Sequence, residues 1–464
     1  MFGVASCRHS GLVVAVDKQI DAILHAPIPG MLLRLAAPNV VATILTTATT
    51  FFDAWFVGRL GTEALASLAL VFPFQTLVIM MAGGAIGGGV TSAISRVLGA
   101  NAAERANAIA WHALLISLAL AAVLALLFGA FAEPIFAAMG GDGAALAGAV
   151  LYAWIAFGGG LALWLTWVVA AIIRGTGDTA TPARAILVTC IAQIILSGGL
   201  TLGWGPLPAL GIAGPATALI ACNAVCAIYL LRHLLCGRAA VTLRAARVAW
   251  APFADIMRVG GLGLINSASI AATVVIVTGF VGQFGTEALA GYGLGGRLEL
   301  MLVPLTFGVG GALTVAVGTN FGAGQYARAR TIALVGAGVV FLVIGALGVI
   351  VALAPGLWLN LFTADPAALA FGETYLMIVA PAYALFGFGQ ALYFASQGTG
   401  WPALPVLVGI LRLTFVSAVG ATVVAFGGPL EMIFAAVAGG MFVIGVGMLL
   451  CLRSRAWRPE QALA

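Results

Sequence analysis

Long apolar stretches recur along the whole chain, and they constrain its fold more than any motif does. An α-helix needs about 20 apolar residues to cross a ~30 Å hydrocarbon core while satisfying its own backbone hydrogen bonds. With 62% hydrophobic and 8% charged residues, the 464-residue chain has too little polar surface for a soluble particle. The sequence therefore predicts an all-α integral membrane protein with twelve spans in two sets of six, at 31–57, 64–92, 107–131, 146–173, 183–203 and 211–235, and at 255–280, 287–318, 330–355, 368–395, 403–425 and 430–452.

Basic residues gather on one side of these predicted spans. Of the 20 lysines and arginines, 17 fall in the lead-in, in the loops that follow even-numbered spans or close to them, and in the tail, whereas the opposite loops hold Arg59 alone. By the positive-inside rule, both termini are expected in the cytoplasm. The predicted organisation is a cytoplasmic lead-in (1–30), two bundles (31–236 and 255–452), a cytoplasmic linker (237–254) and a tail (453–464). The net charge of +5 then reflects topology and lipid contact, so no nucleic-acid partner is expected.

The two sets of six spans are related by internal repetition. FVGRLGTEALA at Phe56 returns as FVGQFGTEALA at Phe280, 224 residues later. GGVTSAISRVLGAN at Gly88 resembles GALTVAVGTNFGAG at Gly311, and a Gly-Thr-Gly core follows both Arg174 and Gln397, each at a spacing of 223. Because six is an even number, the two halves have the same orientation in the membrane, and such parallel repeats place a shared cavity between them.

A carboxylate in the first span is the strongest candidate for a functional group. An ionisable residue inside a spanning helix costs about 2.5–3.5 kcal/mol on insertion scales, so it normally faces a cavity and has a function. At 100° per residue, five polar residues of this span stay within about 40° of one line: Asn39, Thr43, Thr46, Thr50 and Asp53. The alternative is an interfacial acid that pairs with Arg59, although helix geometry places these two side chains on different faces.

The fifth span adds Gln193 and Ser197, which lie one turn apart. They are candidates either for ion coupling together with Asp53 or for ordinary hydrogen bonding between helices. Pro38 lies on the same span as Asp53, and a proline inside a helix permits a kink. We therefore expect Pro38 to bend the helix if Asp53 changes partners on protonation.

The second half carries Glu299 in the eighth span and Arg412 in the middle of the eleventh. A buried arginine is expensive unless it is paired, and Glu299 is the candidate partner. The pair is expected to be structural or gating, with direct substrate contact as the alternative. Tyr375, Tyr383 and Tyr393 of the tenth span serve either packing or the binding of a cation through their aromatic faces.

Five segments in this order resemble the multidrug and toxic compound extrusion (MATE) transporters: LAAPN at Leu35, the first-span Asp53, VGRLGTEALA, GGGVTSAISRVLGA and RGTGDT at Arg174. The resemblance covers about residues 30 to 452. It implies two six-helix bundles forming a V in a bacterial inner membrane. It also implies export of amphiphilic, often cationic, compounds in exchange for protons or Na⁺, with no other cofactor.

This sequence departs from the family pattern at three positions. Thr46 stands where many bacterial members have Gln, and Gln193 and Ser197 stand where many have Asn and Asp. The single formal charge at the site weakens a Na⁺ site and favours coupling to one proton. Since Val277 stands at the position equivalent to Asp53 and Ser197 is not an acid, coupling is expected to use Asp53 alone.

Other functional classes are disfavoured by the sequence. Lys18 is the only lysine and no Walker A motif exists, so nucleotide-driven pumping is not expected. The six cysteines contain no CxxC pair, and the four histidines have no metal-binding spacing. A monomeric proton-coupled exporter is the leading hypothesis. The alternatives are a flippase or exporter of a lipid-linked or other dedicated substrate on the same fold and, less favoured, a membrane enzyme.

Overall fold

The structure is a computed structural model that describes residues 19–363 and 365–458. The described chain is helical throughout its spans and has no strand. Residues 19–25 form a short helix before the first span, and the sequence-based lead-in otherwise lies mostly outside the described residues.

The N-half (residues 28–235) contains six spans built from eight α-helices and a π-helical turn. The elements are α2 (Ile28–Gly58), α3 (Thr62–Ile79), η1 (Met80–Ile86), α4 (Gly87–Gly99), α5 (Ala103–Ala138), α6 (Gly143–Gly158), α7 (Leu161–Gly175), α8 (Ala180–Leu202) and α9 (Ala213–Leu235). The second predicted span is the long unit Thr62–Gly99, and the fourth is the pair α6 and α7, which are bent by 45°.

The C-half (residues 250–451) repeats this order. Its elements are α10 (Trp250–Val281), η2 (Gly282–Phe284), α11 (Thr286–Gly322), α12 (Tyr326–Leu353), α13 (Gly356–Leu359), α14 (Pro366–Val379), η3 (Ala380–Ala382), α15 (Tyr383–Thr399), α16 (Ala403–Ala425) and α17 (Leu430–Cys451). By length and composition the described helices give eleven spans, or twelve when the bent pair counts as one. The predicted fold class is confirmed. The helix α10 begins at Trp250, within the stretch 237–254 that the sequence predicts as a linker.

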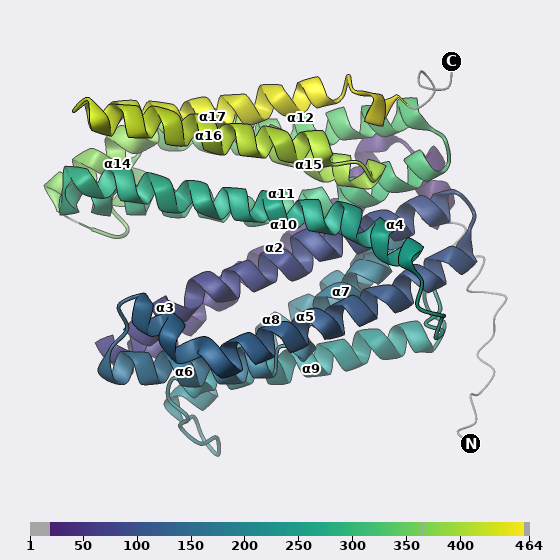
Figure 1. Cartoon of the computed structure of the whole chain (residues 1–464), viewed down its shortest axis with the longest axis horizontal. Coiled ribbons are helices and arrows are strands. Elements are labelled where there is room, and N and C mark those ends of the chain that lie inside the picture. Colours follow the sequence, from purple (N-terminus) through teal and green to yellow (C-terminus); the bar gives the residue numbers. More distant parts are fainter. Residues whose placement is uncertain (1–18, 364, 459–464) are drawn as a thin grey trace.

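The outer faces of both halves remain apolar, as lipid requires. Leu126, Val225 and Leu342 are each more than two-thirds exposed. An apolar side chain gains nothing by avoiding lipid tails, so packing of small residues and polar contacts must hold the helices together instead. Figure 1 shows the two bundles as two layers of roughly parallel helices, with α2 running obliquely from one toward the other.

The first helix of each half belongs to both apolar cores. The opening turns of α2, with Met31 and Leu35, pack in the core of the C-half, whereas Ala42 and Val57 of the same helix pack in the core of the N-half. The exchange is reciprocal, because Ile256 near the start of α10 packs in the N-half core. The two halves are therefore interlocked at the end of the molecule where these helices begin.

This end, which we call the arginine-rich end, carries Arg96, Arg105 and Arg258 around one surface hollow, and Arg328 donates there to the carbonyl of Ala26. Both ends of the described chain lie at this end of the molecule (Figure 1). Asp255 of α10 accepts a hydrogen bond from Arg96 of α4 at 2.8 Å and another from Arg258 at 2.7 Å. The segment before α2 is also tied to the C-half, because Asn320 donates to the carbonyl of Ile23 at 3.3 Å. Polar contacts thus close the arginine-rich end between the two halves.

Candidate functional site

Asp53 lies inside the N-half rather than at its surface. It comes from the last third of α2 and is 4% exposed. The hydroxyl of Ser197, on α8, donates a hydrogen bond to Oδ1 of Asp53. The amide of Gln193, one turn earlier on α8, also lies against this carboxyl. The structure therefore brings together Asp53, Gln193 and Ser197, the three groups that the sequence placed on two different spans.

The rest of the polar stripe on α2 is closer to its own backbone than to the acid. Thr43 donates to the carbonyl of Asn39 at 2.7 Å, and Thr46 donates to the carbonyl of Ala42 at 2.9 Å. Such bonds to the preceding turn satisfy a hydroxyl within an apolar helix. Thr46 also lies 3.6 Å from the sulfur of Cys190 on α8, and Thr50 is half-buried.

The Asn39 end of the polar stripe on α2 faces the C-half of the molecule. Asn39 is buried and donates to the carbonyl of Leu35 at 3.3 Å. A Cβ placed on Gly311 of α11 would lie 3.6 Å from the amide nitrogen of Asn39. The stripe therefore runs from a contact with α11 to the carboxyl beside α8.

Pro38 lies within α2, which continues as one helix from Ile28 to Gly58. Gly308 of α11 packs against α2 two residues later, since a Cβ on Gly308 would lie 2.7 Å from the Cα of Val40. Pro38, which has no backbone N–H to donate, thus lies where α2 passes from the core of the C-half to the core of the N-half.

Arg59 does not pair with Asp53. Its guanidinium lies over the indole ring of Trp55, 3.9 Å from the ring centroid, on the exposed end of α2. Together with the burial of Asp53, this geometry disfavours the alternative of an interfacial acid.

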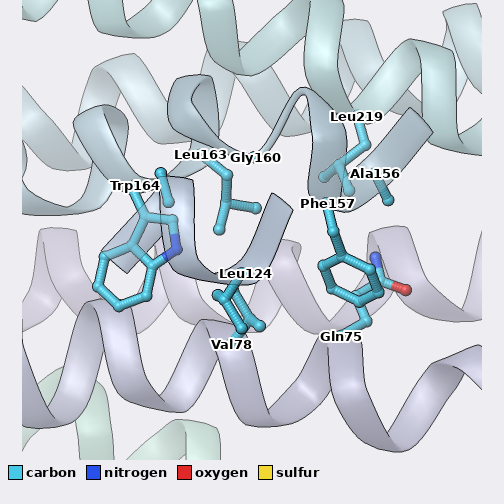
Figure 2. Close-up of a pocket in the computed structure, with 10 residues that line it drawn as sticks. Gln75, Val78, Leu124, Ala156, Phe157, Gly160, Leu163, Trp164 and Leu219 are labelled. Carbon is cyan, nitrogen blue, oxygen red and sulfur yellow. The ribbon is translucent and has the colours of Figure 1, made fainter. Parts of the chain in front are cut away.

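Two polar residues near this site are not predicted by the sequence. The hydroxyl of Tyr152 on α6 donates to Oε1 of Gln75 on α3 at 3.3 Å, and Tyr152 lies in the neighbourhood of Asp53. Figure 2 shows Gln75 at the edge of an otherwise apolar pocket, beside Phe157 and on the side away from Trp164. A glutamine within the apolar second span was the signal that could have identified this pair.

Glu299 and Arg412 are both in the interior of the C-half, but they do not touch. Oε2 of Glu299 accepts a hydrogen bond from Tyr375 of α14 at 2.9 Å. Arg412 of α16 is 4% exposed and donates to the hydroxyl of Thr273 on α10 at 3.1 Å. Within the described residues, ion pairs of 4 Å or less join other residues, and the predicted direct pair is absent from this conformation.

No group of three or more histidine, cysteine or acidic side chains that could hold a metal ion occurs in the part of the chain that the structure describes. Cys190, Cys222, Cys226, Cys236 and Cys451 are free thiols, and Cys7 lies outside the described residues.

Two equivalent six-span halves, interlocked at one end and each holding buried polar groups, define a multi-pass membrane transporter. The profile of the MatE family matches residues 38–197 and 250–423, which is well over half of the chain. The chain belongs to the MATE family of transporters.

Named relatives and solved structures agree with this assignment. The chain is 28% identical over 402 residues to a "FAD transporter" of Shewanella oneidensis, covering 85% of this chain and 88% of that one. It is 22% identical over 405 residues to "Multidrug export protein MepA" of Staphylococcus aureus, with 85% and 87% covered. A transporter of the MOP superfamily from Pyrococcus furiosus superposes with a TM-score of 0.87 at 23% identity, covering 95% of this chain and 98% of that one. At that identity, the superposition shows the fold alone.

Proposed function

We propose that this protein is a secondary antiporter that exports amphiphilic, cationic organic compounds in exchange for protons, with Asp53 as the coupling carboxyl. The main support for this proposal is the buried hydrogen bond from Ser197 to Asp53. Transporters of this family export small organic molecules, and MepA is named as a multidrug export protein. The proposal extends that activity to this chain and adds the coupling ion.

The surroundings of Asp53 support a proton more than Na⁺. A sodium site needs several hard oxygen ligands around the ion. The side chains around Asp53 supply one carboxyl and the neutral groups of Ser197 and Gln193. Burying an ionised carboxylate without an opposite charge is costly, so a carboxyl in this place exchanges readily between its neutral and ionised forms.

The coupling follows from competition for the same acid. When Asp53 is ionised, the N-half carries a negative charge that attracts a cationic substrate. When Asp53 holds a proton, that attraction is lost and the substrate is released. We further propose that the arginine-rich end faces the cytoplasm of a bacterial cell, that the protein works as a monomer in the inner membrane, and that Pro38 lets α2 bend during the exchange.

Asp53→Asn is the direct test. Proteoliposomes containing the purified protein would be loaded with a fluorescent organic cation and given an imposed proton or Na⁺ gradient. Asp53→Asn removes the ionisable group but keeps the size of the side chain. Transport driven by a proton gradient is therefore expected to fall to the level of vesicles that contain no protein. Asp142→Asn, the same change at an exposed acid of the N-half, should transport as the parent does. Unchanged gradient-driven transport in Asp53→Asn would refute Asp53 as the coupling residue.

A second candidate function is export of one dedicated, anionic compound. It is favoured by the 28% identity to a protein named as an FAD transporter. The same vesicles answer this question, because FAD is itself fluorescent. Transport of FAD with no transport of organic cations would replace the first candidate by the second. A lipid-linked substrate would instead require transfer between leaflets, which a labelled lipid reports.

A further inference from the structure

The two halves contain the same tyrosine hydrogen bond at equivalent positions. In the N-half, Tyr152 of α6 donates to Gln75 of α3 at 3.3 Å. In the C-half, Tyr375 of α14 donates to Glu299 of α11 at 2.9 Å. Glu299 follows Gln75 by 224 positions and Tyr375 follows Tyr152 by 223, the spacings that relate the repeats. The bonds between the second and fourth spans are therefore a repeated feature of the fold.

The acid at Glu299 is not required by the packing at this place. In the N-half a neutral amide, Gln75, makes the same bond to a tyrosine. The C-half has no acid at Val277, the position equivalent to Asp53. Each half thus holds a carboxyl in its interior near its repeated tyrosine, but on a different helix.

Arg412 lies near Glu299, yet the two residues have different hydrogen-bond partners in this conformation. Nη2 of Arg412 donates to Thr273, and its Nε is buried with no partner among the described residues. The hydroxyl of Tyr383 is likewise buried without a partner. Two orphaned polar atoms next to a carboxyl are costly to bury, so we expect another conformation to satisfy them.

The charged and titratable groups that act on Glu299 come from four elements. They are Arg412 of α16, Tyr375 of α14, Tyr383 at the start of α15 and Tyr292 of α11 itself. Arg412 supplies the only full charge among these groups. Its attraction favours an ionised Glu299, whereas separation from water favours a neutral one, so the two effects oppose each other at this carboxyl.

We propose that Glu299 is a second proton-binding carboxyl, which bonds to Tyr375 while it holds a proton and pairs with Arg412 after losing it. The proton comes from water on one side of the membrane and returns to water on the other. Loss of the proton leaves a carboxylate that attracts the guanidinium, and the orphaned Nε of Arg412 then gains an acceptor. Protonation returns Arg412 to Thr273. This proposal rests on proton-coupled transport and adds a second titrating group to Asp53.

The number of protons moved per substrate is the first test. Proteoliposomes with a pH-sensitive dye inside would report protons and substrate together in the parent, in Glu299→Gln and in Glu287→Gln. Glu287 is an exposed acid at the start of the same helix, so it is a matched control. The proton-to-substrate ratio is expected to fall by half in Glu299→Gln and to stay unchanged in the control. An unchanged ratio in an active Glu299→Gln protein would overturn the proposal.

A second measurement covers the case in which Glu299→Gln does not transport. Infrared difference spectra of the purified protein, recorded between acidic and alkaline pH, report protonated carboxyl groups directly. The parent should show two buried carboxyl bands, of which Glu299→Gln loses one and Asp53→Asn the other. A difference spectrum of Glu299→Gln identical to that of the parent would show that Glu299 neither gains nor loses a proton in this pH range, and the proposal would be wrong. Because this readout needs no transport, it stands apart from a failure of the proposed antiport.

Discussion

At the scale of single residues, Ser197 determines how Asp53 is held. Its hydroxyl is fully buried and donates to the carboxyl from a neighbouring helix. A hydroxyl at this position leaves the site with one acid where two would repel each other. One carboxyl with a neutral donor can lose and regain a proton without a second charge opposing the change.

Ser197→Ala is expected to slow proton-driven transport about tenfold or more. Hydrogen bonds to charged groups contribute about 1.5–3 kcal/mol, and 1.4 kcal/mol is a factor of ten. Initial rates of cation uptake in proteoliposomes would measure the change. Ser117→Ala is the matched control, because Ser117 is also fully buried but donates only to the carbonyl of Ala113 in its own helix. Equal rates in the two variants would mean that the hydroxyl of Ser197 has no part in coupling.

The residues of the N-half site could be predicted from the sequence, but their partners could be predicted only in part. A carboxylate within twenty apolar residues stands out because lipid penalises it, and the stripe on its helix follows from the helical period. The bond between Gln75 and Tyr152 joins residues 77 positions apart, and no local pattern encodes such a contact. The cost of a buried arginine predicts that Arg412 pairs with Glu299, whereas the structure gives each of the two a neutral partner.

At the scale of helices, a reciprocal glycine contact brings α4 of one half against α11 of the other. A Cβ on Gly99 of α4 would clash with the carbonyl of Thr319, and a Cβ on Gly322 of α11 would clash with the carbonyl of Arg96. Both the two glycines and the two carbonyl-bearing residues are 223 positions apart. The two helices therefore cross at the symmetry axis of the repeat, where only glycine allows the backbones to meet.

Gly322→Ala is expected to open the arginine-rich end. Overpacking a tight contact costs about 1–3 kcal/mol, which changes a two-state equilibrium about 5- to 150-fold. Spin labels on α4 and α11 would report the distance between the halves, which should lengthen or broaden. Gly338→Ala, in the middle of α12 where a Cβ meets nothing within 4 Å, should leave the distance distribution unchanged. An unchanged distribution in Gly322→Ala would show that the crossing is not tight in the membrane.

Breaks and bends within a span could not be predicted from the sequence. The twelve spans were predicted because each must be long and apolar to cross the membrane. The 45° bend between α6 and α7 lies at Gly159 and Gly160, and a π-helical turn spans Met80–Ile86. The hydrophobicity profile is the same whether such a span is straight or broken.

At the scale of the whole molecule, one ion pair joins the halves without a counterpart in the repeat. Asp255 binds Arg96 across the interface, while the position equivalent to Asp255 in the N-half is Met31. The side chain of Arg96 is only 12% exposed, so loss of its partner would leave a mostly buried charge. Closure of the arginine-rich end thus depends on an interaction that only one side of the pseudo-symmetric interface provides.

A double-mutant cycle between Arg96→Gln and Asp255→Asn would measure this interaction. Each single variant is expected to shift the spin-label distances toward an open arginine-rich end. The double variant should shift them less than the sum of the single effects, with a coupling energy of about 0.5–3 kcal/mol. Additive effects would mean that Asp255 serves Arg258 within its own half rather than the contact between halves.

The exchange of helix ends between the two cores has a mechanical consequence. The start of α2 is clamped in the C-half and its remainder in the N-half, and α10 is clamped in the opposite sense. A rotation of one half against the other must then twist or bend these two helices, α2 and α10. Each helix is least rigid close to the point where it passes from one apolar core to the other, because α2 has Pro38 there and α10 has Gly260, Gly261 and Gly263. Since Asp53 lies near the end of α2, a change in its charge acts on the same helix that connects the two halves.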